Sequence, residues 1–150
     1  MKYLLAVLFG GLGVLGIVHL AQADKADKGE KKVDNRVFEL RIYTAAAGKI
    51  DALNARFRQH TNRLFEKHGM TIIGFWMPMR QEPSEQKGGE DKLIYILAYP
   101  SKEAADKSWK AFREDPDWLK AKAESEKDGS LLAKAPESVY MTPTDYSPLK

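Results

Sequence analysis

The stretch LIYILAY at residues 93–99 decides the fold that this sequence predicts, because it is apolar on both sides of a β-strand. Successive side chains of a strand point to opposite faces. One face of this strand therefore carries Leu93, Tyr95, Leu97 and Tyr99, and the other carries Ile94, Ile96 and Ala98. A strand that is apolar on both faces is normally buried on both. We therefore expect both faces of this strand to be covered.

Three more strands are predicted around this one, near residues 36–44, 70–77 and 138–142. In the first, FELRIYT at 38–44 alternates apolar with polar side chains. We interpret its apolar side as the side that faces the core, which comprises Phe38, Leu40 and Ile42. The polar side comprises Glu39, Arg41 and Tyr43.

Helices are predicted between these strands. The first spans about 48–68, carries an apolar stripe and ends at Gly69, a residue suited to a left-handed stop. The second begins after Ser101, and Asp115-Pro116 starts a short continuation to about residue 127. This order of elements favours an α+β fold, the ferredoxin-like βαββαβ plait, which has a four-stranded antiparallel sheet with its helices on one face.

Helices on one face leave the other face of the sheet uncovered. Each Leu- or Ile-sized group that is covered contributes ~1.5–3 kcal/mol, so four or five of them rival the roughly 5–15 kcal/mol that stabilises a whole domain. The simplest cover is a second copy of the same sheet. We therefore predict a homodimer whose sheets close face to face, a dimeric α+β barrel.

The N-terminal residues resemble a signal peptide at 1–23. Lys2 precedes an apolar run that ends in Ala21-Gln22-Ala23, a pattern typical of processing before Asp24. An uncleaved membrane anchor is the alternative, because no Lys, Arg, Asp or Glu lies between Lys2 and Asp24. Residues 24–35 are polar and predict a flexible linker. The expected location is the periplasm or the exterior of the cell.

Cleavage has a direct test. The intact mass of the mature protein is expected to correspond to a chain that begins at Asp24. A mass that includes Met1–Ala23 would show an anchor that is retained.

Composition excludes several classes of function. The 24 basic and 21 acidic residues are interleaved, so no basic stripe for nucleic acid is expected. The chain has no cysteine for a disulfide or a nucleophile. His60 and His68 are eight residues apart on one helix, which is not a metal-ligand spacing. We predict neither a metal nor a cofactor. The loop at 78–91 is longer than a usual hairpin connection and is interpreted as mobile or as a lid.

Four short segments together resemble the NIPSNAP family. They are FELRIYT at 38–44, AGKIDAL at 47–53, GFW at 74–76 and PTDYSPL at 143–149. The resemblance covers a predicted domain at 36–149. It implies a fold similar to the dimeric α+β barrels, whose relatives include cofactor-independent oxygenases and haem-handling proteins. It implies no particular reaction, because many family members lack an assigned one.

The candidate pocket residues are Glu39, Arg41, Tyr43, Trp76 and His60. Arg41 and Tyr43 offer a cation and a hydroxyl to an anionic or carbonyl-bearing ligand. The structural alternative is that Glu39 and Arg41 pair with each other or across the dimer seam. Trp76 could stack on a flat ligand or pack in the core, and His60 is the acid-base candidate.

Two functions are compatible with these residues. The first is a non-catalytic exported dimer that binds a small apolar or aromatic ligand or a protein partner. The second is a cofactor-independent monooxygenase or isomerase, in which Arg41 and Trp76 hold the substrate and His60 moves a proton. The sequence favours the first, because it shows no convincing acid-base set.

Overall fold

The computed structural model describes residues 36–79 and 91–150. Its four-stranded sheet has the order β2-β3-β1-β4, with every neighbouring pair antiparallel. The strands are β1 (Val37–Thr44), β2 (Thr71–Trp76), β3 (Lys92–Tyr99) and β4 (Glu137–Met141). This confirms the predicted α+β plait with its four-stranded antiparallel sheet, in which the 93–99 strand is one of the two central strands. The predicted signal peptide at 1–23, the linker at 24–35 and most of the loop at 78–91 lie outside the described residues.

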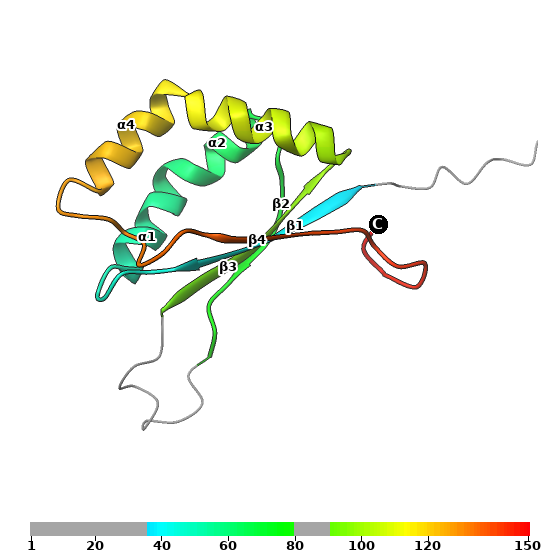
Figure 1. The fold of residues 1–150 in the computed structure, drawn as a ribbon, viewed down its shortest axis with the longest axis horizontal. Helices are drawn as coiled ribbons and strands as arrows, with labels where there is room; N and C mark the ends of the chain where they lie inside the picture. Colours follow the sequence, from blue (N-terminus) through cyan, green and yellow to red (C-terminus); the bar gives the residue numbers. More distant parts are fainter. Residues whose placement is uncertain (1–35, 80–90) are drawn as a thin grey trace, which may run out of the picture. The chain divides into compact units, whose positions relative to one another are not determined.

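The helices cover one face of this sheet (Figure 1). They are α1 (Ile50–Arg56), a π-helical turn η1 (Phe57–Thr61), α2 (Asn62–Lys67), α3 (Lys102–Glu114) and α4 (Pro116–Ser125). Ser101 and Asp115 cap α3 and α4 through their side-chain oxygens, as the sequence predicts. No helix in the described part of the chain is long and apolar enough to cross a membrane.

The predicted first helix contains a turn that the sequence did not predict. Residues Phe57–Thr61 form a π-helix, which widens the helix between α1 and α2. The Thr61 hydroxyl donates a hydrogen bond to the Arg56 carbonyl at 3.3 Å. The turn therefore begins next to Arg56, whose side chain is buried.

The first helix ends at Gly69, as predicted. Gly69 has φ +74°, and the amides of Gly69 and Met70 donate to the carbonyls of Glu66 and Phe65 at 3.0 and 2.9 Å. This is a Schellman ending. We expect Gly69→Ala to lower the free energy of unfolding by about 1 kcal/mol, because a Cβ disfavours positive φ. Urea denaturation measures this, and an unchanged midpoint would contradict it.

The hydrophobic core lies between the helices and the sheet. The β3 side chains Leu93, Tyr95, Leu97 and Tyr99 are all buried there. They pack against a core cluster that includes Leu53, Phe57, Leu64, Phe65, Trp109 and Phe112. The rings of Phe57, Phe65 and Phe75 each lie within 6 Å of the Tyr95 ring centre.

The structure corrects the interpretation of β1. Glu39, Arg41 and Tyr43 pair with Leu97, Tyr95 and Leu93, so the polar side of β1 lies under the helices. The apolar side of β1 lies on the open face instead. The polar side can be buried because the interior supplies hydrogen-bond donors that make the burial of Glu39 favourable.

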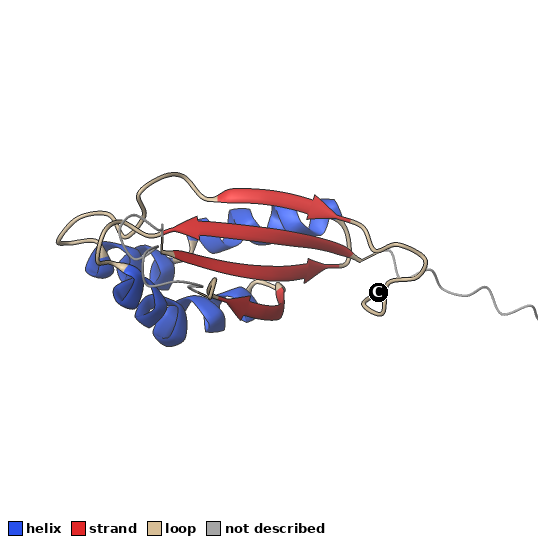
Figure 2. Ribbon diagram, turned by 90° about the horizontal axis from the view of Figure 1, so that it is seen from below, coloured by secondary structure: helices blue, strands red, loops and turns tan. Residues whose placement is uncertain are grey.

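The open face of the sheet carries a row of half-exposed apolar side chains. Leu40 and Ile42 of β1 lie beside Ile96 and Ile94 of β3 in register. Val139 of β4 is 51% exposed beside Leu40. Figure 2 shows the strands with the helices behind them and the C-terminal segment at one end of the sheet. There a small apolar hollow lies between the sheet and the C-terminal segment, lined by Phe38, Ile96, Met141, Thr142, Pro143, Thr144, Ser147 and Leu149.

Candidate ligand-binding cleft

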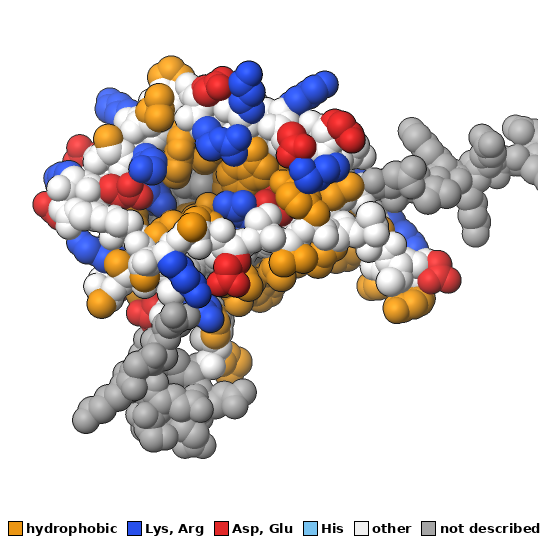
Figure 3. Space-filling model, viewed as in Figure 1, with side chains coloured by type: hydrophobic (Ala, Val, Ile, Leu, Met, Phe, Trp, Pro, Cys, Tyr) orange, Lys and Arg blue, Asp and Glu red, His pale blue; other side chains and the backbone are white. Residues whose placement is uncertain are grey.

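A cleft of about 430 Å³ lies between the helices and the sheet. Its sheet wall comes from β1 and β4 and includes Glu39, Arg41, Tyr43, Ser138 and Tyr140. Its helix wall comes from α1, α3 and α4 and includes Arg56, Trp109, Arg113, Trp118, Lys122 and Glu126. Figure 3 shows the hollow above β4, with hydrophobic side chains in its wall and lysine and arginine side chains around it. A cleft of this volume falls in the range of small-molecule sites, roughly 300–1,000 Å³.

Glu39 is fully buried at the sheet wall and accepts four hydrogen bonds. Its Oε2 accepts from Trp109 Nε1 at 2.6 Å and from the Tyr99 hydroxyl at 2.8 Å. Its Oε1 accepts from the Ser138 hydroxyl at 2.6 Å and from Arg41 Nη1 at 3.0 Å. Burial by itself would raise the pKa of Glu39, but these hydrogen bonds and the Arg41 charge lower the pKa below its ordinary value. Glu39 is therefore a carboxylate at neutral pH.

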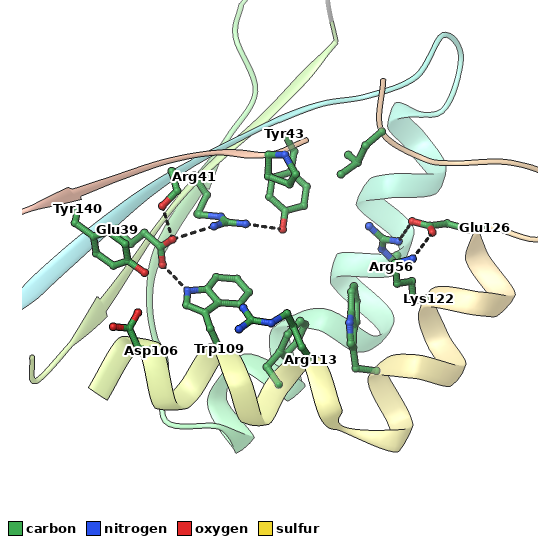
Figure 4. Close-up of a pocket in the computed structure, with 15 residues that line it drawn as sticks. Glu39, Arg41, Tyr43, Arg56, Asp106, Trp109, Arg113, Lys122, Glu126 and Tyr140 are labelled. Carbon is green, nitrogen blue, oxygen red and sulfur yellow. Dashed lines mark hydrogen bonds and ion pairs between the residues drawn. The ribbon is translucent and has the colours of Figure 1, made fainter. Parts of the chain in front are cut away.

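Arg41 links this carboxylate to the cleft. Its guanidinium lies 4.6 Å from the centre of the Trp109 ring, and its Nη2 lies 3.4 Å from the Tyr43 hydroxyl (Figure 4). A guanidinium over an indole is a favourable cation–π arrangement. Burial also raises the pKa of the neighbouring Tyr95 hydroxyl, so this phenol stays protonated beside Arg41.

A second arginine–tryptophan stack forms the helix side of the cleft. The Arg56 guanidinium lies 5.1 Å from the Trp118 ring centre and donates to Glu126 Oε1 at 2.8 Å. Lys122 pairs with the other oxygen of Glu126 at 2.9 Å. The cleft therefore has an aromatic wall and a buried cation on each of two sides.

The sequence-predicted site residues separate into two groups. Glu39, Arg41 and Tyr43 line the same cleft. Glu39 and Arg41 form an ion pair with each other there, which is one of the two pairings that the sequence analysis gave as the alternative to ligand binding. Trp76 lies elsewhere: its side chain is 49% exposed and lines another cavity of about 260 Å³, with Asn54 and Phe75. His60 lies on η1 and lines neither of these cavities.

Arg41, Trp76 and His60 are the three residues that the monooxygenase or isomerase hypothesis requires together. The structure does not bring them into one cavity. No group of three or more His, Asp or Glu side chains within residues 36–79 and 91–150 is placed to hold a metal ion.

Sequence reasoning missed the whole helix wall of the cleft, including Arg56, Trp109, Arg113 and Trp118. A signal was present in the sequence, because Trp109 and Arg113 are four residues apart and share one face of a helix. The contact of that face with the polar side of β1 depends on the tertiary fold.

Comparison with known proteins identifies relatives of this domain. A model of the NIPSNAP family matches residues 38–148. A solved NIPSNAP family protein of unknown function from Agrobacterium tumefaciens is 20% identical with a TM-score of 0.63, over 79% of this chain and 96% of that chain. A second from the same organism is 22% identical with a TM-score of 0.62, over 77% and 99%. An uncharacterised NIPSNAP-like domain protein from Burkholderia xenovorans is 14% identical with a TM-score of 0.62, over 77% and 90%.

The fold and its relatives define the class as a ferredoxin-like α+β domain. The chain belongs to the NIPSNAP family, which confirms the resemblance seen in its sequence. A search of curated proteins finds no match. At these identities the solved relatives establish the fold and leave the ligand open.

Proposed function

We propose that this chain is a homodimeric binding protein. Two copies close their open sheet faces on each other, and each copy binds a small aromatic molecule with an anionic group in its own cleft. The observation that carries the ligand proposal is the cleft itself, where the Arg41–Trp109 and Arg56–Trp118 stacks line one cavity.

The dimer is supported by the open face of the sheet. Leu40, Ile42, Ile94 and Ile96 form a continuous apolar row in the two central strands. Covering such groups contributes ~1.5–3 kcal/mol each. Because both copies present the same row, a two-fold arrangement covers both rows at once.

The ligand class follows from the chemistry of the walls. Indole and phenyl groups favour a flat apolar body, and guanidinium groups favour an anion or a carbonyl oxygen. Four cationic side chains line the cleft against three carboxylates, which leaves one positive charge. A monoanion balances that charge. The cationic residues are Arg41, Arg56, Arg113 and Lys122, and the carboxylates are Glu39, Asp106 and Glu126.

Titration with 2-naphthoate tests the ligand proposal. We expect the ligand to quench tryptophan fluorescence in a saturable way. We expect Trp118→Leu to weaken binding about tenfold or more, because the stacking of one flat ring on an aromatic side chain contributes ~1–3 kcal/mol. Trp76→Leu is the matched control, because Trp76 lies outside the cleft. Binding that depends on Trp76 and ignores Trp118 would contradict the proposed site.

A further inference from the structure

Arg113 is the cation of the cleft that contacts no carboxylate of the protein. Three of the four cationic side chains that line the cleft form ion pairs there, namely Arg41 with Glu39 and both Arg56 and Lys122 with Glu126. Arg113 is the fourth, and it forms no hydrogen bond or ion pair with any residue of 36–79 or 91–150. An anion from outside the chain can therefore bind its guanidinium without displacing a partner.

The remaining carboxylate of the cleft, Asp106, is paired with a different cation. Its Oδ1 lies 2.6 Å from the Nζ of Lys102, one turn earlier on α3. Asp106 and Arg113 are seven residues apart on the same helix, which separates their backbones by about 10 Å. Asp106 therefore leaves the Arg113 charge open to a ligand.

Arg113 is also within reach of a ligand. Its side chain is exposed, whereas the side chains of Arg41 and Arg56 are only 16% and 2% exposed. It lies in the last turn of α3, four residues after Trp109, so the two side chains share one face of the helix. Figure 4 shows the Arg113 guanidinium beside Trp109 at the cleft.

The aromatic side chains of α3 and α4 form a continuous wall next to Arg113. The ring centres of Trp109 and Phe112 are 5.6 Å apart, and those of Phe112 and Trp118 are 4.5 Å apart. All three rings line the cleft. A flat ring that packs on this wall can therefore carry an anionic group to Arg113, which directly follows Phe112 in the chain.

Lys122 is the other exposed cation of the cleft, with a side chain that is 52% exposed. Its Nζ lies 2.9 Å from Glu126 Oε2, so an anion that bound there would be repelled by the Glu126 carboxylate. Arg113 is not paired with a carboxylate in the described part of the chain. Its planar guanidinium can also bind a carboxylate through two parallel hydrogen bonds.

We propose that Arg113 determines the charge specificity of the cleft. The ring of the ligand packs on the aromatic wall of α3 and α4, and its anionic group binds the Arg113 guanidinium at the exposed side of the cleft. This inference rests on the proposed binding function and names the residue that selects an anion. Because water reaches Arg113, we expect a preference for the anion of about fivefold, near the upper end for exposed ion pairs.

Isothermal titration of the wild-type protein at neutral pH with 2-naphthoate and 2-naphthamide tests this. The two probes have nearly the same size and shape, and only the first carries a charge. We expect 2-naphthoate to bind about fivefold more tightly to the wild type. Arg113→Gln is expected to abolish this preference and to leave the affinity for 2-naphthamide unchanged. The variant is expected to fold, because surface substitutions of this kind change stability little.

Two further variants complete the test. Lys110→Gln is the matched control, because it removes the same charge from an exposed position of α3 outside the cleft and should keep the fivefold preference. Arg113→Glu places a negative charge at the same position. It should reverse the preference, so that 2-naphthamide binds more tightly than 2-naphthoate.

The outcomes separate this inference from the proposed function. A preference for 2-naphthoate that persists in Arg113→Gln would overturn the inference and leave aromatic anion binding intact. Loss of the preference in Lys122→Gln but not in Arg113→Gln would also overturn it, because the anion would then lie beside Glu126. Absence of binding of both probes to the wild type would overturn the inference and the proposed ligand together.

Discussion

Glu39→Gln is expected to lower the free energy of unfolding by about 3–5 kcal/mol, the usual loss when one partner of a buried ion pair is removed. A glutamine side chain has one acceptor oxygen where Glu39 has two. The Ser138 and Tyr99 hydroxyls can turn to accept from the new amide. Trp109 Nε1 and Arg41 Nη1 cannot, and they bind opposite oxygens of Glu39. Either orientation of the amide therefore leaves one fixed donor without an acceptor.

Chemical denaturation of the wild-type and variant proteins measures this loss. Glu124→Gln is the matched control, because Glu124 is exposed and pairs with Lys127 at the surface. Its cost should stay below about 1 kcal/mol. A similar small cost for Glu39→Gln would show that the buried hydrogen bonds of Glu39 do not stabilise the fold.

The difference in unfolding free energy between the wild-type and Glu39→Gln proteins is also expected to depend on pH. The pKa of Glu39 is lowered in the folded state, so its contribution is present above its ordinary pKa of 4.5 and is lost as the pH falls through the folded value. The stability difference between wild type and Glu39→Gln should therefore shrink on acidification below about pH 4.5. Asp115, whose pKa is lowered by Lys67 and His68, changes equally in both proteins and cancels.

Ile96→Lys is expected to give the second large effect, conversion of a dimer to a monomer. Ile96 lies on the central strand β3, opposite Leu40 on the open face. A lysine there would place an unpaired charge in an apolar seam, and two-fold symmetry would place two like charges in it. We expect the dimer dissociation constant to rise at least about 100-fold, which corresponds to about 2.7 kcal/mol.

Leu119→Lys is the control for this change. Leu119 is 53% exposed on α4, on the helical side of the sheet, so its replacement adds the same charge away from the open face. Size-exclusion chromatography with light scattering compares the two variants. If the Ile96→Lys protein dimerises as tightly as the Leu119→Lys protein, the dimer interface does not include the open face around Ile96.

The sequence was sufficient to predict the order of the elements. Period-two alternation, Gly69, Ser101 and Asp115-Pro116 are local signals, and each marks an element boundary found in the structure within a few residues. The strand at 93–99 was recognised from its own composition as apolar on both faces, and in the structure it is one of the two central strands. Local patterns of this kind determine secondary structure and topology.

The face of β1 could not be predicted in this way. Alternation at 38–44 shows that two sides differ, but it does not show which side the helices cover. Glu39 is buried because Trp109 and Ser138, 70 and 99 residues away, supply donors. The same long-range contacts make Trp109 part of the cleft wall. The π-helical turn at 57–61 likewise has no composition signal.

The central claim is that the apolar open face of the sheet is covered by a second copy of the chain. Sedimentation equilibrium of the wild-type protein at about 10 μM tests it most directly, at a concentration well above the dissociation constant expected of a stable dimer interface. The account predicts a single species with twice the mass of the chain. A single species with the mass of one chain, unchanged at higher concentration, would contradict it.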